Sequence, residues 1–242
     1  MSESPSIVVL PDAAALAAAV ADRLAALVVA TRAEGRSPRI ALTGGTIAVE
    51  AYERVQAEAA DWSNVELWFG DERFVPEGHA DRNDQQARDA FLDRVGATGV
   101  HAVAGNDCSL SAAEAADQYA ETLPDSFDLV LLGIGPDGHV ASLFPHHPAL
   151  QETERGCVEL FDSPKPPPVR ISMTFPVLNR GAEVWFLASG ESKADAVARA
   201  LADDGTVDET PARGVRGRDQ TLWLLDADAA SRLPGDESLR SP

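Results

Sequence analysis

Short apolar runs alternate with helical segments along this chain of 242 residues, and this alternation constrains the fold more than any other feature. Strands that alternate with helices in this way are typical of a mostly parallel sheet with helices on both faces. We therefore predict an α/β fold, a doubly wound, Rossmann-like sheet in a three-layer α/β/α arrangement. The expected strands are residues 7–10, 39–42, 65–69, 100–103, 127–132, 183–188 and 221–225, with shorter ones at 157–160 and 169–172.

Several helices are marked by the residues at which they start. Asp12 precedes apolar residues at helical spacing, and Ser111 with Glu114 has the spacing of a capping box. We expect a helix after each of these, the second one running to about residue 123. Further helices are predicted at about 47–59, 83–92, 174–181 and 193–201, with helical content after residue 139 and a helix after residue 226.

Composition argues against several classes of partner. Nothing divides the chain, so we expect one domain over residues 1–242. A net charge of −19 does not suit a nucleic-acid or membrane partner, because both require a basic surface. The alanine-rich segment 13–30 contains Asp22 and Arg23, so we interpret it as too polar to span a bilayer. The N-terminus lacks the basic start of a signal peptide. We therefore expect a cytoplasmic protein and take a monomer as the default.

Polar or glycine-rich segments follow four of the predicted strands. The carboxyl ends of parallel strands meet at one edge of a sheet, where α/β proteins bind their ligands, so we expect these segments to form one site. Taken singly, each also has an ordinary structural explanation as a steric turn, a solvated loop or a surface charge. The segments are Gly44-Gly45-Thr46, Asp71-Glu72-Arg73, Asp137-Gly138-His139 and Gly190 to Lys193, and Arg170 is expected to join them from a further strand.

The residue types in these segments indicate anion binding and proton transfer. Glycines before a helix let backbone N–H groups approach a phosphate, and Thr46 adds a hydroxyl. Lys193 falls in the first turn of a predicted helix, where a lysine is unfavourable unless it serves a site. His139 leaves a tight turn and is suited to accept a proton near neutral pH. Cys108 and Cys157 lack the spacing of a disulfide framework or a metal site, and no other ligand spacing is evident, so no metal is expected.

The motifs resemble those of the 6-phosphogluconolactonase family, which belongs to a larger group that includes glucosamine-6-phosphate deaminases. They occur in the family's order between about residues 40 and 200. The motif GIGPDGHVASLFP (133–145) is the most specific of them. The resemblance implies hydrolysis of 6-phospho-D-glucono-1,5-lactone to 6-phosphogluconate in the oxidative pentose phosphate pathway, without a metal or organic cofactor. The motifs are LTGGT (42–46), WFGDERFVP (68–76), GIGPDGHVASLFP (133–145), VRIS (169–172) and GESK (190–193).

The resemblance also implies roles for single residues. His139 is expected to act as the general base on water that attacks the lactone carbonyl. Arg73 would stabilise the developing oxyanion or hold the phosphate, and Asp71 would orient Arg73 or a sugar hydroxyl. The residues expected to bind the substrate or its phosphate are Gly44, Gly45, Thr46, Asn83, Gly138, Arg170 and Lys193. The phosphate loop departs from the Ser-Gly-Gly-Ser-Thr-Pro of many members, because Ile47 removes the second hydroxyl.

Two other functions are weighed against the lactonase. A sugar-phosphate deaminase-isomerase of the same fold would supply a carboxylate shortly after the histidine, but here the residues are Ser142-Leu143-Phe144-Pro145. A non-catalytic sugar-phosphate sensor would keep the cations and Thr46 but would not need His139 in that turn. Turnover of freshly made lactone above the spontaneous rate would separate the lactonase from both alternatives.

Overall fold

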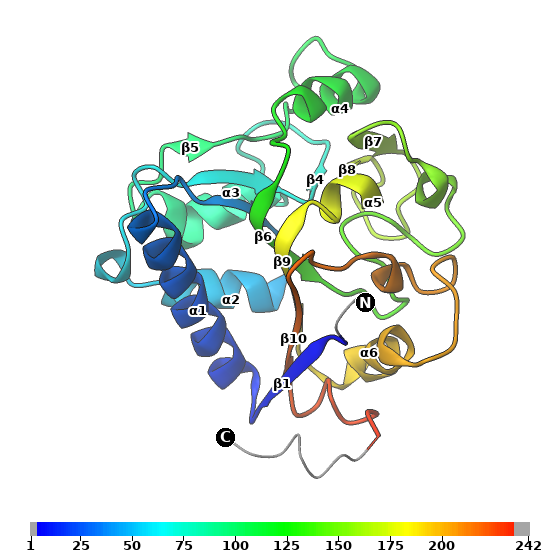
Figure 1. Ribbon diagram of the computed structural model, residues 1–242. Helices are drawn as coiled ribbons and strands as arrows, with labels where there is room; N and C mark the ends of the chain where they lie inside the picture. The colour runs from blue at the N-terminus through cyan, green and yellow to red at the C-terminus, as the bar shows by residue number, and fades with distance from the viewer. Residues whose placement is uncertain (1–3, 235–242) are drawn as a thin grey trace.

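A seven-stranded parallel sheet forms the centre of the computed structural model, which describes residues 4–234 (Figure 1). The strand order is β1-β10-β9-β6-β2-β3-β5, and each neighbouring pair is parallel. The prediction of a mostly parallel, doubly wound sheet is confirmed. The strands are β1 (Ser6–Leu10), β2 (Arg39–Leu42), β3 (Glu66–Phe69), β5 (Gly99–Val100), β6 (Phe127–Gly133), β9 (Gly181–Ala188) and β10 (Gln220–Asp226).

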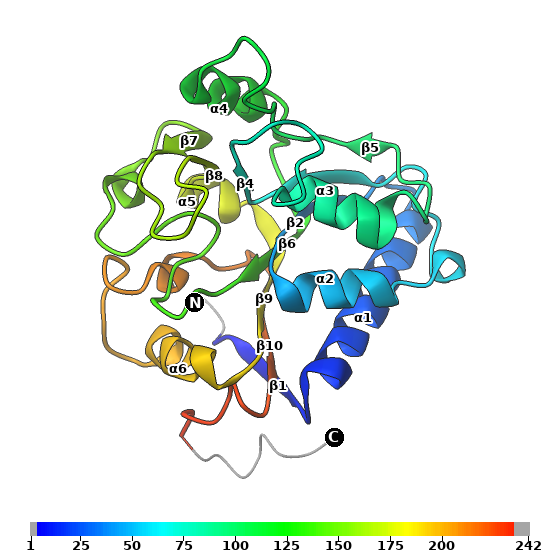
Figure 2. The same cartoon turned by 180° about the vertical axis from the view of Figure 1, so that it is seen from behind.

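Helices cover both faces of the sheet, as Figures 1 and 2 show from opposite sides. One face carries α1 (Ala13–Ala33), α2 (Thr46–Arg54), α3 (Asn83–Ala87) and the π-helix η2 (Arg88–Leu92). The other carries α4 (Ala112–Glu121), α5 (Phe175–Leu178) and α6 (Ala194–Leu201). Single-turn 3₁₀ segments are η1 (Ala57–Ala59), η3 (Pro148–Gln151), η4 (Glu191–Lys193) and η5 (Pro211–Gly214).

Strand β6 shows why the central strands are apolar at nearly every position. Successive side chains of a strand point to opposite faces of the sheet. Leu129 and Leu131 are buried in the core beneath α1 and α2, whereas Val130 and Leu132 are buried in the core beneath α4, α5 and α6. Because both faces are covered, a polar residue on either face of this strand would lie in an apolar core.

Helix α1 is the one described helix that is long and apolar enough to cross a membrane. The expectation that Asp22 and Arg23 make this segment too polar was therefore wrong as an argument from composition. In the structure Leu16, Val20 and Leu24 of α1 are fully buried in the core shared with α2 and the sheet. Packing against this core accounts for the apolar side of the helix.

A second, three-stranded antiparallel sheet lies beside the central one, with the order β4-β8-β7. Its strands are β4 (Asp71–Arg73), β7 (Cys157–Leu160) and β8 (Arg170–Met173). Residues 71–73 were expected in a loop, but they form a strand because they pair with β8 and bury Glu72 completely. Arg170 begins β8, so it enters the site from this smaller sheet and not from the end of a central strand.

Three predicted helices differ in the structure. No helix follows His139; Val140 instead forms an isolated bridge with Leu143. After Asp226 the chain forms turns, in which the Asp226 carboxylate accepts a hydrogen bond from Ala229 N at 2.8 Å. The helix predicted for 47–59 ends at Arg54, and the chain continues in η1.

The order of the strands places a crevice between β2 and β6. From β2 the chain continues outward through β3 to β5, whereas from β6 it continues in the opposite direction through β9 to β10. The loops after β2 and β6 therefore diverge and leave space between them. Both loops belong to the segments that the sequence singled out.

Candidate active site

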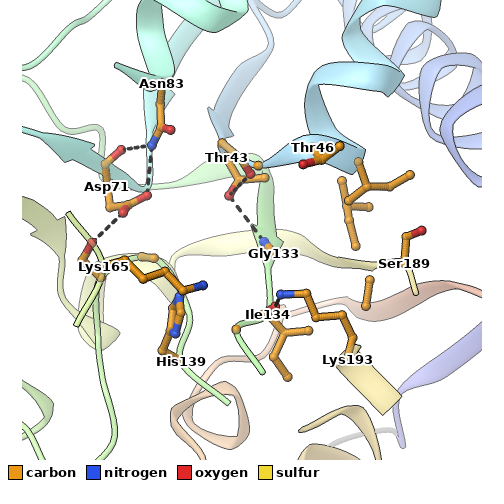
Figure 3. Close-up of a pocket in the computed structure, with 18 of the residues that line it drawn as sticks. Thr43, Thr46, Asp71, Asn83, Gly133, Ile134, His139, Lys165, Ser189 and Lys193 are labelled. Carbon is orange, nitrogen blue, oxygen red and sulfur yellow. Dashed lines mark hydrogen bonds between the residues drawn. The ribbon is translucent and has the colours of Figure 1, made fainter. Parts of the chain in front are cut away.

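A cavity of about 470 Å³ occupies this crevice (Figure 3). It is lined by residues of β4, β6, β8 and β9 and of the segments that follow β2, β4, β6, β7 and β9. Among the site residues predicted from the sequence, Gly138 alone does not line it. Those that do are Gly44, Gly45, Thr46, Asp71, Arg73, Asn83, His139, Arg170 and Lys193.

The loop after β2 is held rigidly against its neighbours. The Tyr52 hydroxyl of α2 donates to Thr43 O at 2.9 Å, and Gly133 N of β6 donates to Thr43 Oγ1 at 3.4 Å (Figure 3). A Cβ atom at Gly44 would overlap the Asn83 side-chain amide, so only glycine fits this position. Helix α2 begins here with no side-chain cap and no acidic residue in its first turn. Its first N–H groups are therefore available to an anion.

His139 is oriented by an aspartate two residues before it. Its Nδ1 lies 2.5 Å from Asp137 Oδ1, and the same oxygen accepts from His139 N at 3.2 Å. Burial alone would raise the pKa of Asp137, but the hydrogen bond and charge of His139 outweigh burial and lower it to about 2. Asp137 is thus a carboxylate at neutral pH. With Nδ1 donating to Asp137, the other ring nitrogen, Nε2, is the one available to accept a proton.

Gly138 shapes this turn. Its φ is +95°, and its N–H donates to Gly135 O at 2.9 Å. A side chain at this position would be strained. Its substrate-binding role stays a prediction; in the structure it does not line the cavity and turns the chain from Asp137 to His139.

Asp71 and Arg73 are connected through Asn83. The Asn83 amide donates to Asp71 O at 2.8 Å and to Asp71 Oδ1 at 3.2 Å, and its oxygen accepts from Arg73 Nη1. Asp71 also accepts from the Ser142 hydroxyl at 2.6 Å. Asp71 therefore orients Arg73 indirectly, by fixing Asn83. Sequence reasoning placed all three in the site but missed this order of contacts and missed Ser142.

Glu72 is a buried carboxylate that sequence reasoning treated as loop charge. One carboxylate oxygen accepts from Arg73 N and Asn83 N, and the other accepts from Asp84 N, at 2.7–2.9 Å. Burial raises the pKa of Glu72, and the Arg82 charge and these N–H groups oppose the rise. Glu72 thus joins β4 to the first turn of α3 and holds Asn83 in place.

Two lysines enter the cavity, and they are the only lysines in the chain. Lys193 donates to Ile134 O at 2.7 Å, and Figure 3 shows it and Lys165 on opposite sides of the cavity. Burial lowers the pKa of Lys193, and the charge of Lys165 lowers it further. Lys165 was not predicted. A signal was present, because the chain uses arginine for nearly all its basic residues and keeps lysine at two positions only.

Arg170 borders the cavity, but much of its guanidinium is occupied elsewhere. Nε donates to Pro167 O at 2.9 Å, and Nη2 donates to Lys165 O at 3.1 Å and to Pro166 O at 3.3 Å. Burial lowers the pKa of Arg170, and the Asp71 charge opposes that effect. Within residues 4–234 no three His, Cys, Asp or Glu side chains gather in a geometry that could hold a metal ion.

A family model described as glucosamine-6-phosphate isomerases/6-phosphogluconolactonase matches residues 11–223. The chain belongs to this family. The resemblance inferred from the motifs is confirmed.

Relatives within this family match the chain over nearly its whole length. The 6-phosphogluconolactonase of Streptomyces coelicolor is 46% identical, covering 97% of each chain. That of Mycobacterium tuberculosis is 45% identical, covering 96% of this chain and 99% of the relative.

Solved structures of family members have the same fold. The 6-phosphogluconolactonase of Trypanosoma brucei has a TM-score of 0.85 at 28% identity, covering 96% of this chain and 100% of that one. A monomeric glucosamine-6-phosphate deaminase has a TM-score of 0.79 at 20% identity, covering 94% of this chain and 99% of that one. At this identity the deaminase shares the fold alone with this chain.

Proposed function

We propose that this protein hydrolyses 6-phospho-D-glucono-1,5-lactone to 6-phospho-D-gluconate, the lactone-opening step of the oxidative pentose phosphate pathway. The full-length relatives named 6-phosphogluconolactonase support this reaction. The observation that carries the proposal is the His139–Asp137 pair, which lies in the same cavity as two lysines and the start of α2. This combination suits a substrate that has an uncharged electrophilic carbonyl at one end and an anionic group at the other.

In the proposed reaction His139 acts as general base. Nε2 takes a proton from water as the water oxygen bonds to C1 of the lactone. The tetrahedral intermediate then collapses, the bond between C1 and the ring oxygen breaks, and the proton on His139 passes to that oxygen. Asp137 stabilises the imidazolium between these steps, because it stays ionised. A lactone is an activated ester, so this assistance and good positioning suffice.

The phosphate is assigned to the start of α2 and to Lys193. The Gly44-Gly45-Thr46 loop offers backbone N–H groups and one hydroxyl, and Lys193 adds a charge-assisted hydrogen bond. Arg73 Nη1 would lie 3.1 Å from a Cβ atom at Gly44, which favours a role at the phosphate over one at the oxyanion. Binding the remote phosphate fixes the lactone carbonyl against His139.

The test is turnover of freshly generated lactone. We expect the purified protein to open the phosphorylated lactone well above the spontaneous rate, measured by a coupled assay of 6-phosphogluconate. Unphosphorylated gluconolactone should be a poor substrate, because it lacks the anion for which the cavity is built. A rate equal to the spontaneous rate would reject the proposal and would favour a sugar-phosphate sensor.

The same protein should release no ammonia from glucosamine 6-phosphate. A deaminase needs a carboxylate shortly after the histidine, and this chain has Ser142-Leu143-Phe144-Pro145 there, which contains none. Measurable ammonia release would move the chain to the deaminase branch of the family.

A further inference from the structure

Ala141 has a backbone conformation that alanine rarely adopts. Its φ is +50°, in the left-handed region where a Cβ atom is strained. Among residues 4–234 the other non-glycine residue with a positive φ is His146, which does not line the cavity. Ala141 does line it, two residues after His139. Backbone strain next to a proposed catalytic base is a reason to ask what the strained residue does.

The residues on both sides hold Ala141 in this conformation. Leu143 N donates to Val140 O at 2.8 Å, which closes a tight turn around Ala141, and the side chains of both residues are fully buried. Ser142 is also buried, and its hydroxyl donates to Asp71 at 2.6 Å. The surrounding contacts therefore outweigh the cost of the positive φ and fix the place of Ala141 relative to the base.

The N–H group of Ala141 has no hydrogen-bond partner among residues 4–234. Three other N–H groups of the same turn are engaged within the protein, those of His139, Ser142 and Leu143. A backbone N–H is a strong donor that requires an acceptor. Because Ala141 lines the cavity, its N–H is available to a molecule bound there.

The proposed reaction creates a charge for which no donor has yet been assigned. Negative charge develops on the carbonyl oxygen of C1 when water bonds to that carbon, whereas Arg73 and Lys193 are assigned to the phosphate at the other end of the substrate. Preorganised backbone N–H groups are effective donors to such an oxyanion. A donor two residues after the base would let one loop act on both the water and the carbonyl of the same carbon.

We propose that the backbone N–H of Ala141 stabilises the oxyanion of the tetrahedral intermediate, and that the strained turn exists to hold this N–H in place. The inference rests on the proposed function. No covalent bond to Ala141 forms or breaks: its N–H donates to the carbonyl oxygen, more strongly while that oxygen carries the charge. When the bond between C1 and the ring oxygen breaks, the carbonyl reforms and the hydrogen bond weakens again.

The direct test replaces the amide of Ala141 by an ester, through incorporation of lactic acid at this position. The ester lacks the N–H and keeps the side chain and the length of the chain. We expect kcat to fall on the order of 10²–10³-fold with KM nearly unchanged. The fold-loss should be equal for the phosphorylated lactone and for gluconolactone, because both form the same oxyanion. A loss confined to the phosphorylated lactone would overturn the assignment.

Two further esters serve as controls. One at Ala80 removes an N–H that also lacks a partner among residues 4–234, at an exposed position outside the cavity, and should leave kcat as in wild type. One at Leu143 removes the N–H that donates to Val140 O, so it weakens the same turn and leaves the Ala141 N–H present. The Leu143 ester should lower the melting temperature at least as far as the Ala141 ester, but kcat far less. Equal losses of kcat in these two would make the role of Ala141 structural.

The failure of this inference can be told apart from the failure of the proposed function. If wild type opens the lactone and the Ala141 ester retains its kcat, the inference falls and the function stands. If wild type has no lactonase activity, both fall. Should the Ala141 ester not fold, nuclear magnetic resonance of wild type gives the readout: 6-phosphogluconate, whose C1 carboxylate resembles the oxyanion, should shift the Ala141 amide proton downfield. An unshifted proton at saturation would overturn the inference.

Discussion

At the scale of single residues, the His139–Asp137 pair is formed by near neighbours in the sequence. Asp137 and His139 are two positions apart, and the positive φ of Gly138 turns one side chain toward the other. The low pKa of Asp137, about 2, keeps its carboxylate ionised at every pH at which the protein would be assayed. Because this pKa lies below its usual value, the carboxylate stabilises the fold above about pH 4, and this contribution is lost only as pH falls toward 2.

Replacing His139 by alanine should abolish most of the catalysis and spare binding. We expect kcat to fall on the order of 10²–10⁴-fold with KM nearly unchanged, because general-base assistance is lost and the phosphate contacts remain. The rate is measured after subtraction of spontaneous hydrolysis, and the melting temperature serves as the control for folding. Asp137→Asn should lose less, since the base remains but is poorly oriented. A His139→Ala variant within a few-fold of wild-type kcat would remove His139 from its assigned role.

At the scale of elements, one buried carboxylate connects β4 to α3. Helix α3 has no side-chain cap at Arg82, and Glu72 takes that place from a different strand by accepting from Asn83 N and Asp84 N. The helix start and the strand are therefore one unit, and Asn83 is positioned by both. This explains how a five-residue helix presents a site residue reproducibly.

Replacing Glu72 by glutamine should destabilise the fold, and more so at low pH. The amide nitrogen cannot accept a hydrogen bond, so one buried N–H loses its partner at a cost of roughly 1–3 kcal/mol. Burial raises the pKa of Glu72 above 4.5, so the folded state binds its proton more tightly than the unfolded state. The contribution of Glu72 to stability is thus full below about pH 4.5 and declines as pH rises.

The measurement is urea unfolding of both proteins at pH 5 and pH 8. The difference in the free energy of unfolding between wild type and Glu72→Gln should shrink at pH 8, by about 1.4 kcal/mol for each pH unit by which the pKa is raised. A difference that grows with pH would mean that the three N–H groups outweigh burial and lower the pKa of this carboxyl. Activity should fall with stability, because Asn83 and Arg73 depend on Glu72.

At the scale of the whole molecule, an acidic surface surrounds a cationic cavity. The net charge is −19, yet Arg73, Lys165, Arg170 and Lys193 line the cavity. The large exposed hydrophobic side chains among residues 4–234 are Val29, Phe161 and Val207, which lie in separate segments of the chain. Such a surface repels a second copy and offers little apolar area for association.

We expect a monomer in solution. Size-exclusion chromatography with light scattering should give one species near 25.6 kDa at physiological salt. Higher salt screens the repulsion between copies without creating an apolar interface, so the mass should not change with ionic strength. A species of twice this mass at micromolar concentration would show that the described surface contains an interface that charge and exposure do not reveal.

The sequence by itself determined the fold class and most members of the site. Strand and helix periods are local properties of a chain, and the carboxyl ends of parallel strands must share an edge, so the sequence is enough to bring the glycine loop, His139 and Lys193 to one site. Tertiary structure alone decided the partners of the polar groups. Glu72 is buried, Ser142 donates to Asp71, and Lys165 and Lys193 line one cavity because the fold brings distant segments together. Periodicity carries no information on such pairings, since they depend on contacts between residues far apart in the chain.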